Sequence, residues 1–205
     1  MRRQARLASR AVDASDLIPG FDPETELERR VTSAPELLEG LAWGAPRFGH
    51  PEGAVGTHVS QLLQALDRNG ETGEVRELLR FMALVHDSFK YQVRERLPRA
   101  GPNHHAMRAR RFAERFTDDE RVLATLELHD RPYALWRKMQ RTGKLDERAF
   151  RRMMDRISDP ALFLRFIELD GSTAGKRREP IVWFRDELVT RGLVDRSEAD
   201  SAQVR

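Results

Sequence analysis

The stretch Leu78-Leu79-Arg80-Phe81-Met82-Ala83-Leu84-Val85-His86-Asp87 decides the fold of this chain. Its apolar run belongs in a core, and the spacing of the apolar residues predicts a buried helix that begins near Glu74. The run ends on an imidazole and a carboxylate. Burying an unpaired charge is costly, whereas a bound divalent cation turns both side chains into satisfied ligands. His86 and Asp87 therefore indicate a metal site at the end of a core helix.

The composition limits the kind of protein that this chain can be. It has 205 residues, of which 40% are hydrophobic and 34% charged, as is typical of a soluble globular protein. No apolar stretch approaches the roughly 20 residues of a membrane helix, so we expect no membrane span. The basic amino terminus lacks the apolar region of a secretory signal, so we expect a cytoplasmic protein. Cysteine is absent, which leaves His, Asp, Glu and water as metal ligands.

Apolar residues recur at helical spacing along most of the chain, and no alternating strand pattern is present, so we expect an all-α bundle. The predicted helices cover residues 24–31, 35–41, 57–69, 74–85, 104–116, 118–140, 147–157, 160–170 and 181–191. The first 23 residues carry little apolar periodicity and are predicted to form a flexible arm. The predicted organisation is an arm with short helices over residues 1–47, a helical domain over residues 48–192, and a polar tail over residues 193–205.

The histidines are confined to one part of the sequence. All six lie between positions 50 and 129, at His50, His58, His86, His104, His105 and His129. A single histidine is more often a hydrogen-bonded neutral imidazole than a ligand. However, His58, His86-Asp87 and Asp170 lie on three predicted helices beside core residues, and converging helix ends can form one ligand cluster.

The order of these residues resembles a known signature. His58, His86-Asp87 and Asp170 resemble the H…HD…D pattern of the HD-domain superfamily of metal-dependent phosphohydrolases, over roughly residues 48–190. Residues 50–58, HPEGAVGTH, are similar to the loop before the first ligand in the HD domains of bacterial CCA-adding tRNA nucleotidyltransferases. Residues 84–90 resemble the family's L-x-H-D-x-G-K, and residues 104–109 its G-H-E-x-x-x-A. Phe89 replaces the glycine and His105 the glutamate of these motifs.

The resemblance implies an HD-domain helical bundle with a short N-terminal helical extension. It implies cleavage of a phosphoester of a nucleotide or a related small phosphorylated substrate by a metal-activated water. The expected cofactor is one or two divalent ions of Mn, Fe, Ni, Mg or Zn. One ion would be held by His58, His86, Asp87 and Asp170. Asp87 would bridge to a second ion held by His104 and His129.

The same resemblance implies roles beside the metal. Asp87 and Lys90 are expected to be catalytic, with the Lys90 ammonium stabilising charge as the transition state develops. Arg108, His105 and His50 are expected to bind substrate. Tyr133 and Trp136 are among the aromatic residues that could stack a base, although most large aromatic residues simply fill cores.

Two other functions stay open at this point. The chain could be a metal-stabilised binding or regulatory module without turnover, in which Phe89 blocks the pocket. It could also be an HD-type diiron oxygenase, whose set of six ligands the histidines and aspartates resemble. Arginine clusters such as Arg108 to Arg115 suit phosphate-bearing ligands and permit nucleic-acid binding without indicating it. A homodimer is possible.

Overall fold

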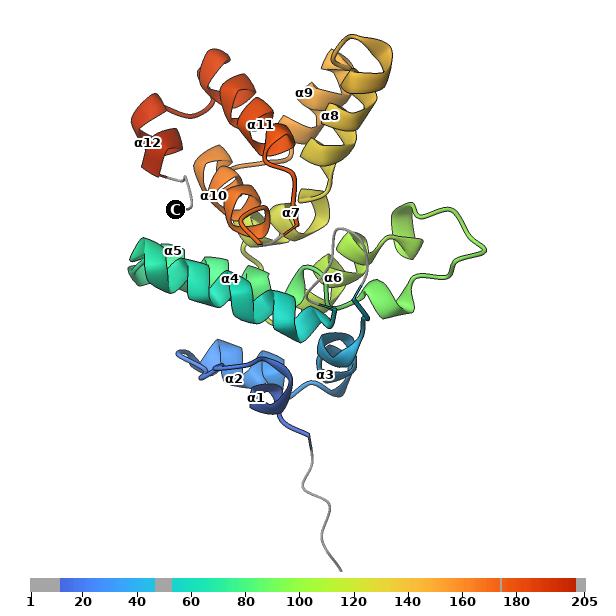
Figure 1. Ribbon diagram of the computed structural model, residues 1–205, viewed down its shortest axis with the longest axis vertical. Coiled ribbons are helices and arrows are strands. Elements are labelled where there is room, and N and C mark those ends of the chain that lie inside the picture. Colours follow the sequence, from blue (N-terminus) through green and yellow to red (C-terminus); the bar gives the residue numbers. More distant parts are fainter. Residues whose placement is uncertain (1–11, 47–52, 174, 202–205) are drawn as a thin grey trace, which may run out of the picture.

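The computed structural model describes residues 12–46, 53–173 and 175–201, and these ranges contain helices and no strand. The prediction of an all-α bundle is confirmed (Figure 1). None of the described helices has the length and apolar character needed to cross a membrane. The helices are α1 (Ala14–Leu17), α2 (Glu26–Thr32), α3 (Pro35–Ala42), α4 (Val55–Asn69), α5 (Gly73–Val85), α6 (His105–Ala113), α7 (Glu120–Leu128), α8 (Arg131–Thr142), α9 (Glu147–Met154), α10 (Pro160–Asp170), α11 (Glu179–Thr190) and α12 (Arg196–Ser201), with 3-10 turns η1 (Lys90–Gln92) and η2 (Gly101–Asn103).

The second half of α5 and the residues that follow it are continuously buried, as the apolar sequence predicts. Every residue from Leu79 to Phe89 is buried, including the charged Arg80. The Arg80 guanidinium binds both carboxylate oxygens of Glu28 on α2, at 2.7 and 2.9 Å. Because both side chains are buried, removal of Arg80 would leave the Glu28 carboxylate without its cation, at a cost of about 3–5 kcal/mol. Removal of Glu28 would leave Arg80 its second partner, Glu24, at 2.9 Å. The pair therefore joins the N-terminal helices to the central one.

Helix α10 lies between two hydrophobic clusters. Leu162, Phe166 and Leu169 belong to the larger cluster, which includes α1, α3, α4 and α5. Phe163 and Ile167 face the smaller cluster with α9, α11 and α12. The apolar residues of α10 thus occupy two faces, and its charged residues Arg165 and Glu168 pair with Glu71 and Arg185. In Figure 1, α10 accordingly runs between α4 and α5 below it and α11 above it.

The expected flexible arm is wrong for the residues that the structure describes. Asp13 caps α1 with its side chain, and Ala14, Ile18 and Phe21 are buried in the same cluster as α4 and α5. These three residues recur at spacings of three and four, too few to mark a helix in the sequence but enough to form one packed face. The polar tail expected after residue 192 also differs, because Val194 and Ala199 are buried against the smaller cluster.

The single helix expected over residues 118–140 is wrong in a way that affects the site. Helix α7 ends at Leu128 and α8 begins at Arg131, with Pro132 in its first turn. Proline has no backbone N–H and clashes with the preceding turn, so it starts a helix rather than continuing one. The break leaves His129 and Asp130 in the corner between the two helices.

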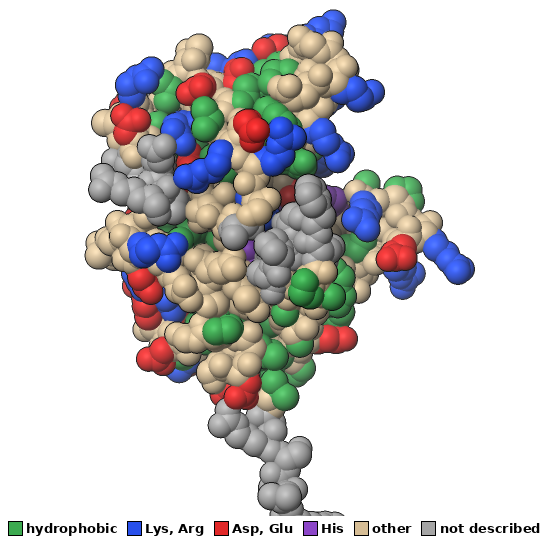
Figure 2. Space-filling view, viewed as in Figure 1, with side chains coloured by type: hydrophobic (Ala, Val, Ile, Leu, Met, Phe, Trp, Pro, Cys, Tyr) green, Lys and Arg blue, Asp and Glu red, His purple; other side chains and the backbone are tan. Residues whose placement is uncertain are grey.

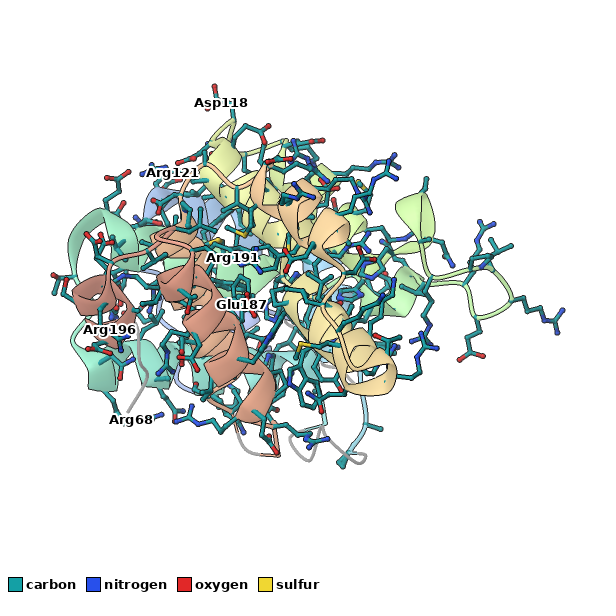
Figure 3. The ribbon with its side chains drawn as sticks, turned by 90° about the horizontal axis from the view of Figure 1, so that it is seen from above. Arg68, Asp118, Arg121, Glu187, Arg191 and Arg196 are labelled. Atoms are coloured by element: carbon teal, nitrogen blue, oxygen red, sulfur yellow. The ribbon has the colours of Figure 1, made fainter. Side chains whose placement is uncertain are left out.

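The loop between η1 and α6 projects from the rest of the molecule, as the view from above shows (Figure 3). Its two sides are joined by Asn103, which is buried. The Asn103 side chain accepts from the Arg94 amide at 2.9 Å and donates to the carbonyls of Arg94 and Pro98 at 3.0 and 3.1 Å. Asn103 thereby sets the path of the chain from Lys90 to His105. Arg191, which is labelled in Figure 3, follows α11 and donates to Glu147 of α9 at 2.9 Å.

The close approach of α3 to the end of α5 gives a test of the fold. A Cβ on Gly40 would stand 1.7 Å from the carbonyl oxygen of Ser88, so Gly40→Ala must displace the backbone beside Asp87. We expect Gly40→Ala to lower the free energy of unfolding by about 1–3 kcal/mol or more in urea denaturation. Glu39→Ala, one residue away and exposed, is the matched control and should change little. Equal stability of Gly40→Ala and wild type would show that α3 does not pack here.

Candidate metal centre

The candidate site is built from the ends of five helices. His58 lies in the first turns of α4, His86 and Asp87 follow α5, His105 begins α6, His129 and Asp130 follow α7, and Asp170 ends α10. Helix ends carry backbone groups without partners in the helix, so side chains there can turn inward without breaking the ladder. The folding of distant helices onto α5 and α10 therefore brings the four imidazoles and three carboxylates together.

Two of the imidazoles are oriented by the backbone. His86 Nδ1 donates to the carbonyl of Ala83 at 3.0 Å, and His129 Nδ1 donates to the carbonyl of Leu126 at 2.9 Å. A carbonyl only accepts, so Nδ1 carries the proton in both rings, and in the neutral form Nε2 carries a lone pair. Both Nε2 atoms are buried without a hydrogen-bond partner. This arrangement is typical of histidines that bind metal through Nε2.

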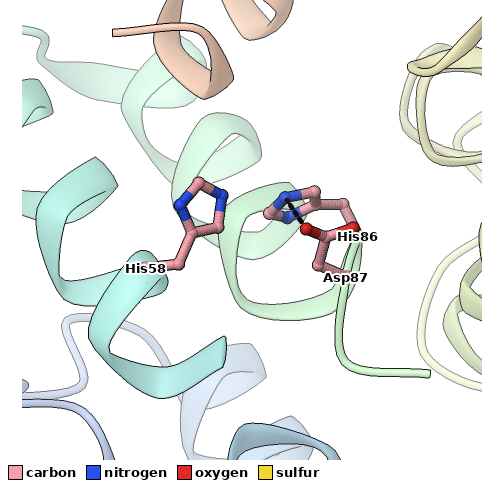
Figure 4. Close-up of side chains that lie close together, drawn as sticks. All are labelled: His58, His86 and Asp87. Carbon is pink, nitrogen blue, oxygen red and sulfur yellow. Dashed lines mark ion pairs between the residues drawn. The ribbon is translucent and has the colours of Figure 1, made fainter. Parts of the chain in front are cut away.

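His58, His86, Asp87 and Asp170 form what we call the inner cluster. Asp170 Oδ1 lies 3.0 Å from His58 Nε2 and 3.6 Å from His86 Nε2. Asp87 Oδ2 lies 3.5 Å from His86 Nε2 (Figure 4). Nitrogen and oxygen ligands about 2.1 Å from one ion stand roughly 3–3.5 Å apart, so these spacings fit a metal ion. The donor set and its spacing are therefore compatible with the predicted metal.

Asp87, His105, His129 and Asp130 form the outer cluster. Asp87 Oδ1 lies 3.4 Å from His105 Nε2 and 3.8 Å from His129 Nε2. Asp130 Oδ2 lies 3.1 Å from His105 Nε2. Asp87 thus turns one oxygen to each cluster, as a carboxylate that bridges two ions must do. Ligand atoms of Asp87, His105 and His129 lie within 4.8 Å of one another, as do those of His58, His86 and Asp87.

The charges of the clusters are strongly coupled. Burial lowers the pKa of His86, but Asp87 and Asp170 outweigh burial and raise that pKa to about 10. Burial alone would raise the pKa of Asp87, but Lys90 and His86 hold it well below its usual value. Lys176 and His58 do the same for Asp170. The site thus contains ionised carboxylates that require positive charge, which protons or a cation can supply.

The structure places both His104 and His105 at the outer cluster, where ligand atoms of His104, His105 and Asp130 lie within 4.8 Å of one another. His104 Nδ1 accepts from the amide of Ala106 and caps α6, so its proton lies on Nε2, 3.9 Å from Asp130 Oδ2. This tautomer presents a donor to the cluster rather than a lone pair. His105, which was expected to bind substrate, lies against Asp87 instead. The two rings stack with centroids 4.7 Å apart. They differ in that His104 Nδ1 accepts from the Ala106 amide and caps α6.

The remaining predicted residues fall into three places. Lys90 contacts Asp87 Oδ2 from η1 and is directly at the site. Arg108 donates to Gln92 Oε1 at 3.2 Å. Gln92 ends the turn η1 that Lys90 begins, so Arg108 lies next to the site and does not belong to it. Phe89 packs on Phe112 in the core. His50 lies outside the described residues.

Sequence reasoning missed two residues of the site. Asp130 completes the outer cluster, and its signal was the second His-Asp dipeptide, at 129–130. Lys176 Nζ lies 3.7 Å from Asp170 Oδ1 and belongs to the basic run 176–178. The sequence spacing of Asp130 and Lys176 does not predict that they join the site, because tertiary packing brings their segments there.

No family model, curated protein or solved structure matches this chain. The family is therefore not shown, and the chemistry of the site rests on its own side chains. Ligand atoms close enough for one metal ion occur in three groups, namely His58, His86 and Asp87; Asp87, His105 and His129; and His104, His105 and Asp130.

Metal content distinguishes these clusters from a structural network. We expect about one to two divalent ions per chain by elemental analysis of wild type, and loss of the inner ion in His86→Ala, because that ring supplies a buried lone pair. His104→Ala is the matched control and should keep its metal, since His104 Nδ1 caps α6. His105→Ala should lose the outer ion. Loss of metal in His104→Ala with retention in His105→Ala would reverse the assignment drawn from the cap.

Proton competition gives a second test. In metal-free protein, protonated His86 contributes stability that is fully present below pH 6.5 and is lost as pH rises through about 10. Metal needs an unprotonated Nε2, so metal affinity rises over the same window. We expect the melting temperature in chelator to fall as pH rises above 7. The increase in melting temperature on addition of Mn should become larger over the same pH range.

The carboxylates do not contribute in this window because their pKa values lie well below it. His86→Gln is the control and should reduce the fall in chelator, since a glutamine does not titrate. Some of the fall should remain, because Asp130 and Asp87 outweigh burial and raise the pKa of His129 as well. A melting temperature in chelator that rises with pH in wild type would contradict the raised pKa of His86.

Proposed function

We propose that this protein is a metal-dependent phosphohydrolase that cleaves a small phosphoester. The observation that carries the proposal is the shared carboxylate of Asp87, which faces one His/Asp cluster with each oxygen while a lysine contacts it from solvent. The motif resemblance to HD-domain phosphohydrolases supports the same reading. Two adjoining metal sites with a nearby ammonium group suit an in-line displacement at phosphorus.

The two clusters supply ligand sets that share Asp87. The inner ion would be held by His58, His86, Asp87 and Asp170, and the outer ion by Asp87, His105, His129 and Asp130. When bound, divalent cations supply Lewis acidity, which lowers the pKa of water and offsets the charge of phosphate oxygens. In the overall reaction, water adds to phosphorus, the ester P–O bond breaks, and the alcohol leaves with one proton of that water.

The chain's own residues hold the charges of the reaction in place. Lys90 has a fifth of its side chain exposed, so its ammonium can reach both Asp87 and a bound phosphate. Lys176 lies against Asp170 in the same way. Two ammonium groups at the rim attract a phosphate dianion and stabilise charge on its oxygens. Their effect is strengthened by the dry floor of the site.

That floor is made by the Phe166 ring. It packs edge-on against His86, with centroids 5.4 Å apart, and lies 6.3 Å from His129. An apolar ring beneath the imidazoles excludes water and lowers the local dielectric, which strengthens each interaction between charges above it. The ring also fixes the rotation of both imidazoles.

One observation favours a second function, an oxygenase. The two clusters offer imidazole and carboxylate ligands with Asp87 between them, and histidine and carboxylate are the ligands of non-haem iron oxygenases. Iron as the native metal together with oxygen consumption would favour this function. Metal that raises the melting temperature without turnover of either kind would instead indicate a binding or regulatory module.

The role of Lys90 tests the hydrolase. We expect Lys90→Gln to lower kcat on a phosphoester by about 10²–10³-fold in metal-loaded protein, because it removes one charge that stabilises the transition state. Lys138→Gln, an exposed lysine of α8 that pairs with Asp146, is the matched control. Metal content must stay at the wild-type level. An unchanged kcat would mean that Lys90 only neutralises Asp87.

A further inference from the structure

An aromatic pair lies on α8, one turn beyond the outer cluster. The rings of Tyr133 and Trp136 stack, with centroids 6.1 Å apart and planes inclined by 21°. Tyr133 is 46% exposed, whereas Trp136 is buried behind it. The guanidinium of Arg177 lies 5.1 Å from the Trp136 ring centre, and that of Arg137 lies 5.9 Å from the Tyr133 ring centre. We call these four residues the aromatic platform.

The platform is joined to the site along α8. Asp130 precedes the helix and Tyr133 follows it by three residues, so the two lie on one face at neighbouring positions. Side chains of a helix lean toward its N-terminus, so the Tyr133 ring leans toward Asp130. Asp130 in turn lies 3.1 Å from His105 Nε2. The exposed ring is therefore about one helical turn from the outer cluster.

The platform is joined to the site a second time, through the segment after α10. Lys176 reaches Asp170 of the inner cluster at 3.7 Å, and the next residue, Arg177, lies over Trp136. Consecutive residues thus contact the metal centre and the platform. In Figure 2, Lys and Arg side chains border the hollow in which histidine is visible, on the side of α8 and α11.

We propose that the aromatic platform binds the base of a nucleotide whose phosphate lies at the metal centre. This inference rests on the proposed phosphohydrolase function and names its substrate class. The half-exposed Tyr133 ring is backed by Trp136 and has the Arg137 guanidinium over it. A base can stack on this ring and gain cation–π attraction from that guanidinium. The one-turn spacing allows one small molecule to reach both the platform and the clusters. A sugar phosphate without a base would contact the clusters alone.

Binding without chemistry tests the platform by itself. Adenosine and ribose are titrated into the full chain, with tryptophan fluorescence as the readout. We expect adenosine to bind and ribose not to bind, and Tyr133→Leu to weaken adenosine binding by about 5-fold or more, the lower end for loss of one stacking contact. Tyr133→Phe keeps the ring and should bind adenosine like wild type. Because Tyr133 is exposed, neither variant threatens the fold.

Turnover separates this inference from the function on which it rests. In metal-loaded protein we expect kcat/KM for adenosine monophosphate to exceed that for ribose 5-phosphate by about 5-fold or more. Tyr133→Leu should bring the ratio toward one, and Lys138→Gln should keep the wild-type ratio. Adenosine binding without turnover of either substrate contradicts the hydrolase and supports the platform. Equal kcat/KM for the two substrates, or adenosine binding unchanged in Tyr133→Leu, overturns the platform.

Discussion

The carboxylate of Asp87 is the constraint on which the structure depends. It is 4% exposed and lies at the end of a helix that is buried over its last two turns. An ionised group at such a place is stable only where positive charge surrounds it. Lys90, three imidazoles and, in the proposed function, metal ions meet that need from different helices. The helix ends that converge on Asp87 thus supply the positive charge that its buried carboxylate requires.

That convergence requires close backbone approaches and a central helix. Gly40 lets α3 reach the Ser88 carbonyl, directly after Asp87. Helix α10 has apolar residues on two faces, which join the two hydrophobic clusters, and its last residue is Asp170. Packing and chemistry are therefore linked, because the residues that hold α10 in place also set the distance from Asp170 to His58 and His86. Phe166 belongs to both, since it is a core residue that touches two imidazoles.

The platform on α8 extends the same logic outward. Pro132 ends the continuous helix that periodicity favours, and the break turns His129 and Asp130 inward while α8 carries Tyr133 away from them. Pro132 thus lies between the charged residues of the outer cluster, His129 and Asp130, and the aromatic residues Tyr133 and Trp136. The basic run after α10 meets both parts, with Lys176 at the clusters and Arg177 at the platform.

The sequence by itself determined the helical class and the buried end of α5, and it predicted the cluster of His58, His86, Asp87 and Asp170 that the structure brings together. These features follow from local periodicity and from the cost of placing charged groups beside an apolar run, and both are properties of neighbouring residues. Tertiary structure alone decided that His105 Nε2 lies 3.4 Å from Asp87 Oδ1. It also decided that His104 Nδ1 accepts from the Ala106 amide, which sets the tautomer of His104. It alone brought in Asp130 and Lys176, and it alone placed Tyr133 and Trp136 beside the clusters. Contacts between segments far apart in the chain depend on how helices pack in three dimensions, and spacing along one chain does not encode that packing.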